Sequence, residues 1–278
     1  MPEPVPAPAT DPSVRAFARR VLLSADLATK LAPPPAGLTV DEPAAPERHD
    51  APGRPANLVM APGREVSVPP IAGMRDPAQR ARILHALANH ELQAAELFAW
   101  ALLAFADQPA GFRAGLLAIC ADEQRHCLAY AARARALGCE LGDCPVTGHF
   151  WNKLDRLATP LGFVCTMGLT FENANLDFTR EYADAARAAG DGETADVLEM
   201  VHADEVDHVR FAWTWLGRLA PGEAAWDAYT RVATHPLGPH RARGASFDEP
   251  ARRKAGLDDD FIARLRDIAP RRPGGGGR

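Results

Sequence analysis

The strongest constraint on the fold of this chain is a pair of five-residue segments that share the pattern Asp-Glu-x-x-His. The first spans residues 122–126 and the second spans residues 204–208. On an α-helix, residues three apart lie on one face, so each segment directs a carboxylate and an imidazole toward one point. One more glutamate precedes each segment at nearly equal spacing, since Glu91 and Glu172 lie 32 and 33 residues before the glutamates of the two segments.

This spacing predicts two antiparallel helical hairpins. With turns near residues 107–109 and 190–192, each hairpin runs about 16 residues from its first glutamate to the turn and about 14 residues back, a rise of roughly 24 and 21 Å. The ligands of each hairpin therefore end at nearly the same height. Two facing hairpins would gather six side chains around one cavity: Glu91, Glu123, His126, Glu172, Glu205 and His208. This is the ligand pattern of di-iron and di-manganese carboxylate proteins.

The charge of this set predicts two bound cations. Four glutamates and two neutral histidines carry four negative charges, which two divalent ions would neutralise, as a buried site requires. Carboxylate and imidazole suit iron, with manganese or a mixed manganese–iron pair as alternatives. The competing interpretation, six solvated helix residues, is disfavoured because core-type side chains flank the segments: Ile119, Leu128, Val201 and Phe211.

Bulk properties exclude several other classes of protein. The net charge of −5 gives no general attraction to nucleic acid or anionic membranes. No apolar run reaches the length of a transmembrane helix, and the proline-rich N-terminus does not resemble a secretion signal. Five cysteines without a C-x-x-C pair argue against a disulfide framework or a zinc–thiolate site, so a cytoplasmic location is expected.

The pattern along the chain predicts an all-α protein in three parts. Residues 1–75 are expected to form one helix from Asp11 to about Leu31, followed by a long proline-rich strap along the bundle. Residues 76–220 are expected to form a four-helix bundle, with helices at 76–106, 109–138, 160–189 and 193–219. Residues 221–278 are expected to add helices near 223–232 and 257–268 and a partly disordered tail.

The two segments also carry a resemblance to known proteins. Both resemble the helix motifs of bacterial multicomponent monooxygenases and ribonucleotide reductase small subunits, which belong to the ferritin-like superfamily. The run Leu84 to Leu97, with shorter pieces at 24–31, 62–64 and 251–256, is similar to a bacterial ferritin-like family of unknown function. A more distant similarity links the motifs to the bacterial tRNA-modifying di-iron hydroxylase. The resemblance covers most of the chain and implies a ferritin-like bundle with the six residues as metal ligands.

Further roles follow from this resemblance. It implies that Asp122 and Asp204 hydrogen-bond the ligating histidines across the site and fix their tautomers, whereas the alternative is a pair of surface carboxylates. Tyr130 lies at the offset of the radical-forming tyrosine of ribonucleotide reductase small subunits. The alternative role for Tyr130 is a core tyrosine with a bonded hydroxyl.

Residues on the ligand-bearing faces are expected to shape a substrate pocket: Ala95, Phe98, Cys127, Cys165, Gly168, Leu169 and Asn175. Asn175 is more polar than the resemblance suggests at that place, which implies a different substrate. Glu96 lies about 140° around the helix from Glu91, so a solvated or interhelical role is expected rather than metal binding. His85 and His90 are expected to be polar positions with hydrogen-bond partners.

Together these features predict an oxidase or hydroxylase of a small organic substrate, with two iron ions, dioxygen as co-substrate and an external electron donor. Iron storage or ferroxidase activity is an alternative, which the long terminal extensions disfavour. Modification of tRNA is another, because the C-terminal segment carries basic residues: Arg241, Arg243, Arg252, Arg253 and Lys254. Acidic neighbours dilute them, so a solvated tail is expected. A metal-free interaction bundle is the remaining alternative. A monomer or homodimer without membrane or nucleic-acid partners is expected.

Overall fold

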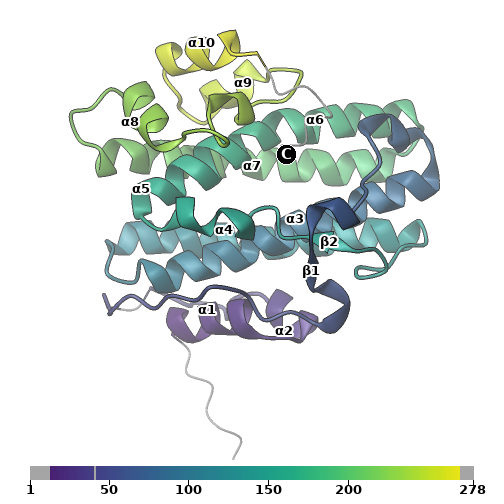
Figure 1. Ribbon diagram of the computed structural model, residues 1–278, viewed down its shortest axis with the longest axis horizontal. Coiled ribbons are helices and arrows are strands. Elements are labelled where there is room, and N and C mark those ends of the chain that lie inside the picture. The colour runs from purple at the N-terminus through teal and green to yellow at the C-terminus, as the bar shows by residue number, and fades with distance from the viewer. Residues whose placement is uncertain (1–12, 41, 270–278) are drawn as a thin grey trace, which may run out of the picture.

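Four long helical segments dominate the computed structural model, which describes residues 13–40 and 42–269 (Figure 1). They pack as a bundle in which α3 lies along α4 and α6 lies along α7. Their bounds are α3 (Pro77–Ala104), α4 (Ala110–Ala136), the continuous series α5 (Pro160–Phe163), η5 (Val164–Glu172) and α6 (Asn173–Ala188), and α7 (Gly192–Leu219). The expected all-α class is therefore confirmed.

Local sequence signals explain where these helices begin. The Asp76 carboxylate accepts a hydrogen bond from the Gln79 backbone N–H, and Pro77 occupies the first turn of α3. Asp191 caps α7 in the same way through the Thr194 N–H. α3 buries residues on nearly all its faces, because α4, α1 (Val14–Leu23) and η3 (Ile71–Arg75) pack against it.

The third bundle helix is not the uniform α-helix expected over 160–189. Residues Val164–Glu172 form a π-helical stretch between α5 and α6. Inside it, the Thr170 hydroxyl donates a hydrogen bond to the Cys165 carbonyl (2.8 Å). A Cβ atom on Gly168 would lie 2.1 Å from the Cβ of Ala212, so glycine permits a close approach of this stretch to α7. The wider turn ends at Glu172 and therefore sets where that carboxylate lies.

The N-terminal segment contains two short helices, α1 (Val14–Leu23) and α2 (Leu27–Leu31), instead of one helix to Leu31. The chain becomes extended at Ser24, and Asp26 caps a new helix by accepting from the Thr29 N–H. α1 is capped by Ser13, while the predicted start at Asp11 lies outside the described residues. Side-chain capping at Asp26 therefore stabilises the break.

The proline-rich strap packs against the bundle, as Figure 1 shows beside α1. The backbone N–H groups of Ala44 and Glu47 donate to the carbonyls of Ala106 and Leu103, and the Trp100 indole donates to the His49 carbonyl. Short elements follow: η1 (Ala56–Leu58), β1 (Met60–Ala61), η2 (Gly63–Glu65) and η3 (Ile71–Arg75). β1 pairs in parallel with β2 (Val146–Thr147), which precedes η4 (Trp151–Leu157).

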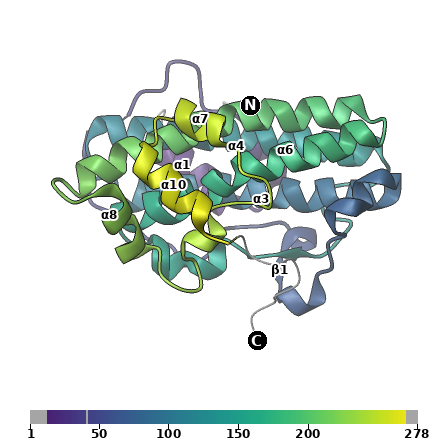
Figure 2. The ribbon, with the colours of Figure 1, turned by 90° about the horizontal axis from the view of Figure 1, so that it is seen from above.

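The C-terminal residues form a helical layer over α6 and α7 (Figure 1). Its elements are α8 (Ala225–Val232), η6 (Pro239–Arg241), α9 (Glu249–Lys254) and α10 (Asp259–Asp267). Figure 2 shows α8 and α10 toward one end of the long helices. Among the described residues, no helix is both long and apolar enough to cross a membrane.

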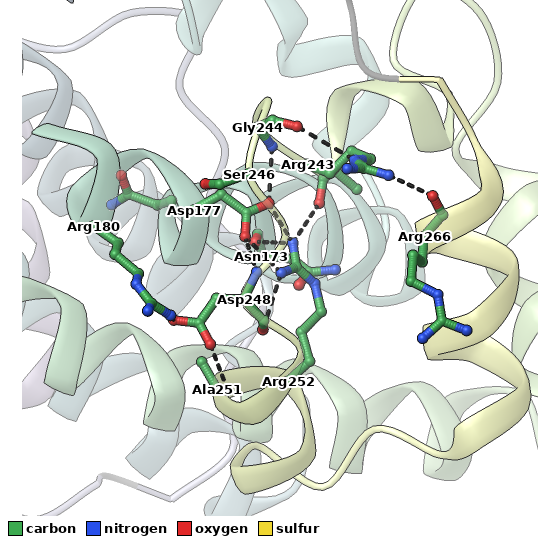
Figure 3. Close-up of polar contacts among 12 residues, drawn as sticks. Asn173, Asp177, Arg180, Arg243, Gly244, Ser246, Asp248, Ala251, Arg252 and Arg266 are labelled. Atoms are coloured by element: carbon green, nitrogen blue, oxygen red, sulfur yellow. Dashed lines mark hydrogen bonds and ion pairs between the residues drawn. The ribbon is translucent and has the colours of Figure 1, made fainter.

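This layer overturns the expectation of a solvated basic tail. Arg252 is fully buried and forms an ion pair with Asp177 of α6 (2.7 Å), which is also fully buried (Figure 3). The Asp177 carboxylate accepts further hydrogen bonds from the backbone N–H groups of Gly244 and Asp248. One carboxylate thus fastens residues 244–252 to the bundle. The predicted disorder after residue 270 lies outside the described part of the chain.

Two apolar clusters fill the bundle, and polar side chains lie between them. On α4, one cluster ends at Cys120 and the other begins at Cys127. On α7, the corresponding boundary runs between Val201 and Val206. The Glu-x-x-His segments fall at these boundaries. Leu128, expected to be a core neighbour of the first segment, is instead 50% exposed because it points away from both clusters.

Candidate metal centre

The fold brings the six predicted ligands together in the middle of the bundle. Their atoms form two overlapping groups, in each of which one ligand atom per residue lies within 4.8 Å of all the others. The first group is Glu91, Glu123, His126 and Glu205, and the second is Glu123, Glu172, Glu205 and His208. All six residues are buried. Because two glutamates belong to both groups, the arrangement offers two adjacent cation positions with Glu123 and Glu205 shared between them.

The two imidazoles point the same nitrogen into this cluster. Nδ1 of His126 lies 3.8 Å from carboxylate oxygens of Glu91 and Glu123. Nδ1 of His208 lies 3.3 Å from Glu123 and 3.2 Å from Glu205. A neutral imidazole that carries its proton on Nε2 would present the Nδ1 lone pair to a metal ion.

The outer nitrogens contact aspartates in a crossed arrangement. Nε2 of His126 lies 3.0 Å from Oδ2 of Asp204, and Nε2 of His208 lies 3.3 Å from Oδ2 of Asp122. Each Asp-Glu-x-x-His segment therefore supports the histidine of the other segment. These are the contacts that the resemblance implied. A carboxylate at Nε2 favours the tautomer that leaves Nδ1 available for coordination.

Arg125 joins the two aspartates from outside. Its guanidinium donates to Asp122 (2.7 Å) and to Asp204 (2.9 Å). Hydrogen bonding with His126 and then with Arg125 lowers the pKa of Asp204 to about 2. For Asp122, burial alone would raise the pKa, but hydrogen bonds with His208 and Arg125 outweigh it and lower the pKa. Both aspartates are therefore anionic at neutral pH.

Burial and mutual repulsion dominate the carboxylates inside the cluster. Burial, followed by the charges of neighbouring glutamates, raises the pKa of Glu91 and of Glu172 well above the ordinary value. Burial would also raise the pKa of Glu123, but the attraction of the nearby His126 and His208 imidazoles outweighs it and lowers that pKa. Four glutamates this close together resist simultaneous ionisation unless positive charge is supplied.

Unpartnered polar atoms show what the cluster lacks. Both carboxylate oxygens of Glu123 and Nδ1 of His126 are buried and have no hydrogen-bond partner among the described residues. Leaving such groups unpaired in the interior costs free energy, and cations at the two adjacent positions would supply the missing interactions. The donor atoms are carboxylate oxygens and imidazole nitrogens, which suit iron or manganese. The cluster can therefore hold metal ions.

A cavity of about 660 Å³ reaches this cluster from the α3–α6 side. Glu91 and Glu172 lie in its wall, so the cavity gives access to the ligands at both ends of the cluster. Asn175 also lines it and donates a hydrogen bond from Nδ2 to Oε1 of Glu205 (2.7 Å). Asn175 thus connects the cavity with one shared carboxylate.

The structure places the other expected pocket residues elsewhere. Six of the seven are not among those that line this cavity: Ala95, Phe98, Cys127, Cys165, Gly168 and Leu169. They are packed into the bundle interior, where Gly168 lies against Ala212 and Phe98 packs edge-on against Phe163. The π-helical stretch changes the rotation per residue. Counting α-helical turns back from Glu172 therefore does not show which side chains of this stretch face the cavity.

Tyr130 is fully buried in the apolar cluster on one side of the centre. Burial, followed by the charges of Glu91, Glu205 and Glu123, raises its pKa well above the ordinary value, so the phenol keeps its proton. This location is compatible with either role expected from the sequence.

Sequence reasoning missed most of the cavity wall. His149 and Phe150 form a ring cluster with His90 and Phe171, with ring centroids 4.8 to 6.0 Å apart. His90, expected only to be a satisfied polar residue, lines the cavity, and burial lowers its pKa to about 4. The run of aromatic residues at 149–151 was the available signal, but the helical period of the bundle does not extend to it.

The remaining polar predictions are resolved by direct contacts. Glu96 is fully buried and interacts with Lys30 (3.1 Å), Arg54 (2.8 Å) and the Trp151 indole (2.9 Å). It therefore joins separate segments of the chain, and the solvated alternative is wrong. His85 accepts a hydrogen bond from the Gly142 backbone N–H (3.0 Å), as expected for a satisfied polar position.

Comparison with known families places the chain. Residues 10–263 match the model of the family described as "Protein of unknown function (DUF455)". The chain belongs to this family. A search of curated proteins and a search of solved structures found no match to this DUF455 chain. The geometry of the cluster and its cavity therefore carries the functional argument.

Proposed function

We propose that this chain is a ferritin-like, non-haem dinuclear iron enzyme that uses dioxygen to oxidise or hydroxylate a small organic substrate. The observation that carries this proposal is the contact between the cavity and the cluster, because Glu91 and Glu172 belong to both. A cluster with unpaired buried donors calls for cations, and a cavity against it provides room for a substrate.

Each residue of the cluster has a distinct place in this proposal. Glu91 and His126 would hold one ion, Glu172 and His208 would hold the other, and two glutamates would contact both. Bound ferrous ions would supply the electrons for the reduction of dioxygen, and a manganese pair or a mixed pair is the alternative. An external electron donor would restore the reduced state after turnover.

The surrounding residues position these ligands. Asp204 and Asp122 hold the outer nitrogens of the two histidines, and Arg125 ties both aspartates together. Asn175 restrains one oxygen of Glu205 at the cavity side. The apolar clusters on either side of the centre exclude water from the remaining faces.

The nature of the cavity favours an organic substrate over iron alone. Its wall includes Phe150, Phe171, Phe178 and Tyr182, which offer apolar surface to a carbon skeleton. A route for iron would need carboxylate ligands along its length, whereas outside the cluster the described lining contains one carboxylate, Glu181, which binds Ser246. The ferroxidase alternative therefore receives less support than an oxygenase or oxidase.

Metal content tests the proposal directly. The wild-type chain, Glu123→Ala and the control Glu140→Ala should be reconstituted anaerobically with ferrous iron and then exposed to oxygen. Glu140 is exposed and pairs with Arg135, so its removal leaves the centre unchanged. We expect about two iron ions per chain in the wild type and control, fewer than one in Glu123→Ala, and oxygen uptake that follows iron content.

Two outcomes would contradict the proposal in different ways. Failure of the wild-type chain to retain stoichiometric iron would overturn the di-iron site. Iron binding with oxygen uptake that no organic compound accelerates, across a broad substrate screen with a chemical reductant, would favour a ferroxidase.

A further inference from the structure

The cavity has an interior end and a solvent end that differ in character. At the interior end, Glu91 and Glu172 are each 5% exposed and Ala94 is 2% exposed. At the solvent end, Ile71 of η3 and Phe178 of α6 are 37% and 40% exposed. Two large apolar side chains on separate elements therefore form a rim around the opening. Such a rim favours a molecule with an apolar body.

Positive charge in the wall comes from the C-terminal layer. Arg241 and Arg243 both line the cavity, although neither belongs to the ligand-bearing helices. The Arg243 guanidinium donates from Nε to the carbonyl of Gly244 and from Nη1 to the carbonyls of Arg266 and Ile268. It also stacks on Phe247, and Nη2 has no such backbone acceptor in the part of the chain that the structure describes. Among the described residues, no carboxylate lies within ion-pair distance of Arg243.

The nearby acidic group is already engaged. Glu181 lines the cavity, but one of its oxygens accepts hydrogen bonds from both the backbone N–H and the hydroxyl of Ser246 (2.7 Å each). Asp177, which approaches the same segment, binds Arg252 and two backbone N–H groups. With the glutamates at the interior end neutralised by metal ions, the wall carries two guanidinium groups and one carboxylate.

The segment that carries the arginines is held rigidly. Asp177 accepts from the Gly244 N–H (2.9 Å), next to Arg243, and the buried Arg252 donates to the Ala242 carbonyl (3.3 Å) (Figure 3). A Cβ atom on Gly244 would lie 2.8 Å from the Cβ of Asp177, so the backbone lies close against α6. The cationic wall is therefore a built part of the cavity and not a loose tail.

We propose that the substrate of this site is a singly charged organic carboxylate with an apolar body, held by Arg241 and Arg243 while its apolar portion reaches the Glu91–Glu172 end. This inference rests on the proposed function, because it assigns the substrate class of that site. A guanidinium group attracts a carboxylate by its charge and binds it through charge-assisted hydrogen bonds, and the aromatic wall accommodates the carbon skeleton. A neutral molecule of the same shape would lose the interaction with the guanidinium groups and keep the contact with the aromatic wall.

A matched pair of probes tests this proposal. 4-Phenylbutyrate and 4-phenyl-1-butanol share one apolar body and differ in charge, and isothermal titration calorimetry gives both dissociation constants. In the anaerobic ferrous protein we expect the carboxylate to bind at least about ten-fold more tightly. Arg241→Gln should reduce this preference by about three-fold or more, while Arg135→Gln, at an exposed site outside the cavity wall, should leave it unchanged.

Two variants of one rim residue, with opposite charges, keep the proposal testable if Arg241→Gln fails to fold. Phe178 is partly exposed, and Phe178→Lys and Phe178→Glu remove the same ring, so their comparison isolates charge. We expect the lysine variant to bind phenylbutyrate about three- to ten-fold more tightly than the glutamate variant. Their affinities for the alcohol should agree within about two-fold.

Each contrary result has a defined meaning. Equal affinities for the two probes in the wild type would overturn the proposal. A second result would also overturn it: a preference for the carboxylate that persists in Arg241→Gln but disappears when the metal is removed. In that case the carboxylate would bind the metal ions and not the arginines. Failure to retain iron would instead count against the proposed function. The comparison of the two probes in metal-free protein would still measure the contribution of the arginines.

Discussion

Oδ2 of Asp204 lies 3.0 Å from Nε2 of His126, a residue 78 positions earlier in the chain. The reciprocal contact joins Asp122 to His208 over 86 positions. The two halves of the bundle are therefore linked by two aspartates that lie outside the ligand cluster and contact its histidines. Each aspartate fixes the orientation of an imidazole on the opposite hairpin, so loss of one aspartate should weaken the centre without removing a ligand.

Substitution of Asp204 tests this relationship. Asp204→Ala should lower iron affinity by about 10- to 100-fold, because the His126 ring loses the carboxylate that holds its tautomer. Competition with a chromogenic chelator measures the change. Asp207→Ala, which removes an exposed carboxylate from the same helix, provides the control. Equal affinities in the two variants would show that Asp204 is a surface group without influence on the centre.

The buried ion pair between Asp177 and Arg252 should contribute strongly to the integrity of the fold. Asp177→Ala leaves a fully buried guanidinium without its carboxylate, for which we expect a loss of about 3–5 kcal/mol in the free energy of unfolding. Urea denaturation measures this loss. The double variant Asp177→Leu/Arg252→Leu should recover part of it, because no charge then remains buried. A loss below about 1 kcal/mol for Asp177→Ala would contradict this account.

Close packing at Gly168 gives a prediction with a rescue. In Gly168→Ala, the new methyl group would lie 2.1 Å from the Cβ of Ala212, so one helix must shift. We expect a loss of about 1–3 kcal/mol, measured by thermal or urea unfolding. Ala212→Gly removes the obstructing methyl and should restore most of the stability of the Gly168→Ala variant. If Ala212→Gly does not restore stability, the destabilisation would come from the π-helical backbone and not from the contact with Ala212.

Glu47 gives a pH-dependent prediction. Hydrogen bonding with Arg19 lowers its pKa to about 2 against an opposing effect of burial, and His49 and Arg15 add to the lowering. A carboxylate whose pKa is lowered in the folded state stabilises that state above its unfolded pKa and loses the contribution as pH falls. The stability difference between wild type and Glu47→Gln should therefore be greatest above about pH 5, fall as the pH approaches 2, and vanish below about pH 2.

The size of this effect is limited by solvent. Glu47 retains 20% of its side-chain exposure, so we expect less than about 1 kcal/mol at neutral pH. Urea unfolding at pH 7 and pH 3 measures the difference, and added salt should reduce it. A difference that stayed constant between these two pH values would show that the ion pairs with α1 do not hold the strap.

The sequence alone determined the all-α class and the candidate ligands. Both depend on local periodicity, because a Glu-x-x-His segment and an upstream glutamate at a matching distance specify helix faces and heights before any tertiary contact is known. The capping residue Asp76 also located the start of α3. These signals lie within a helix or a hairpin, where spacing translates directly into geometry.

Only the tertiary structure decided the shape of the cavity and the charge of its wall. Residues at 70–71, 149–150 and 240–245 meet there from three irregular segments, and no period along the chain relates them. Gly168 of the π-helical stretch packs closely against α7, and Arg252 is buried against Asp177, 75 positions away. Local spacing specifies which side chains share a helix face. Long-range packing specifies which irregular segments cover that face, and so determines what can reach the centre.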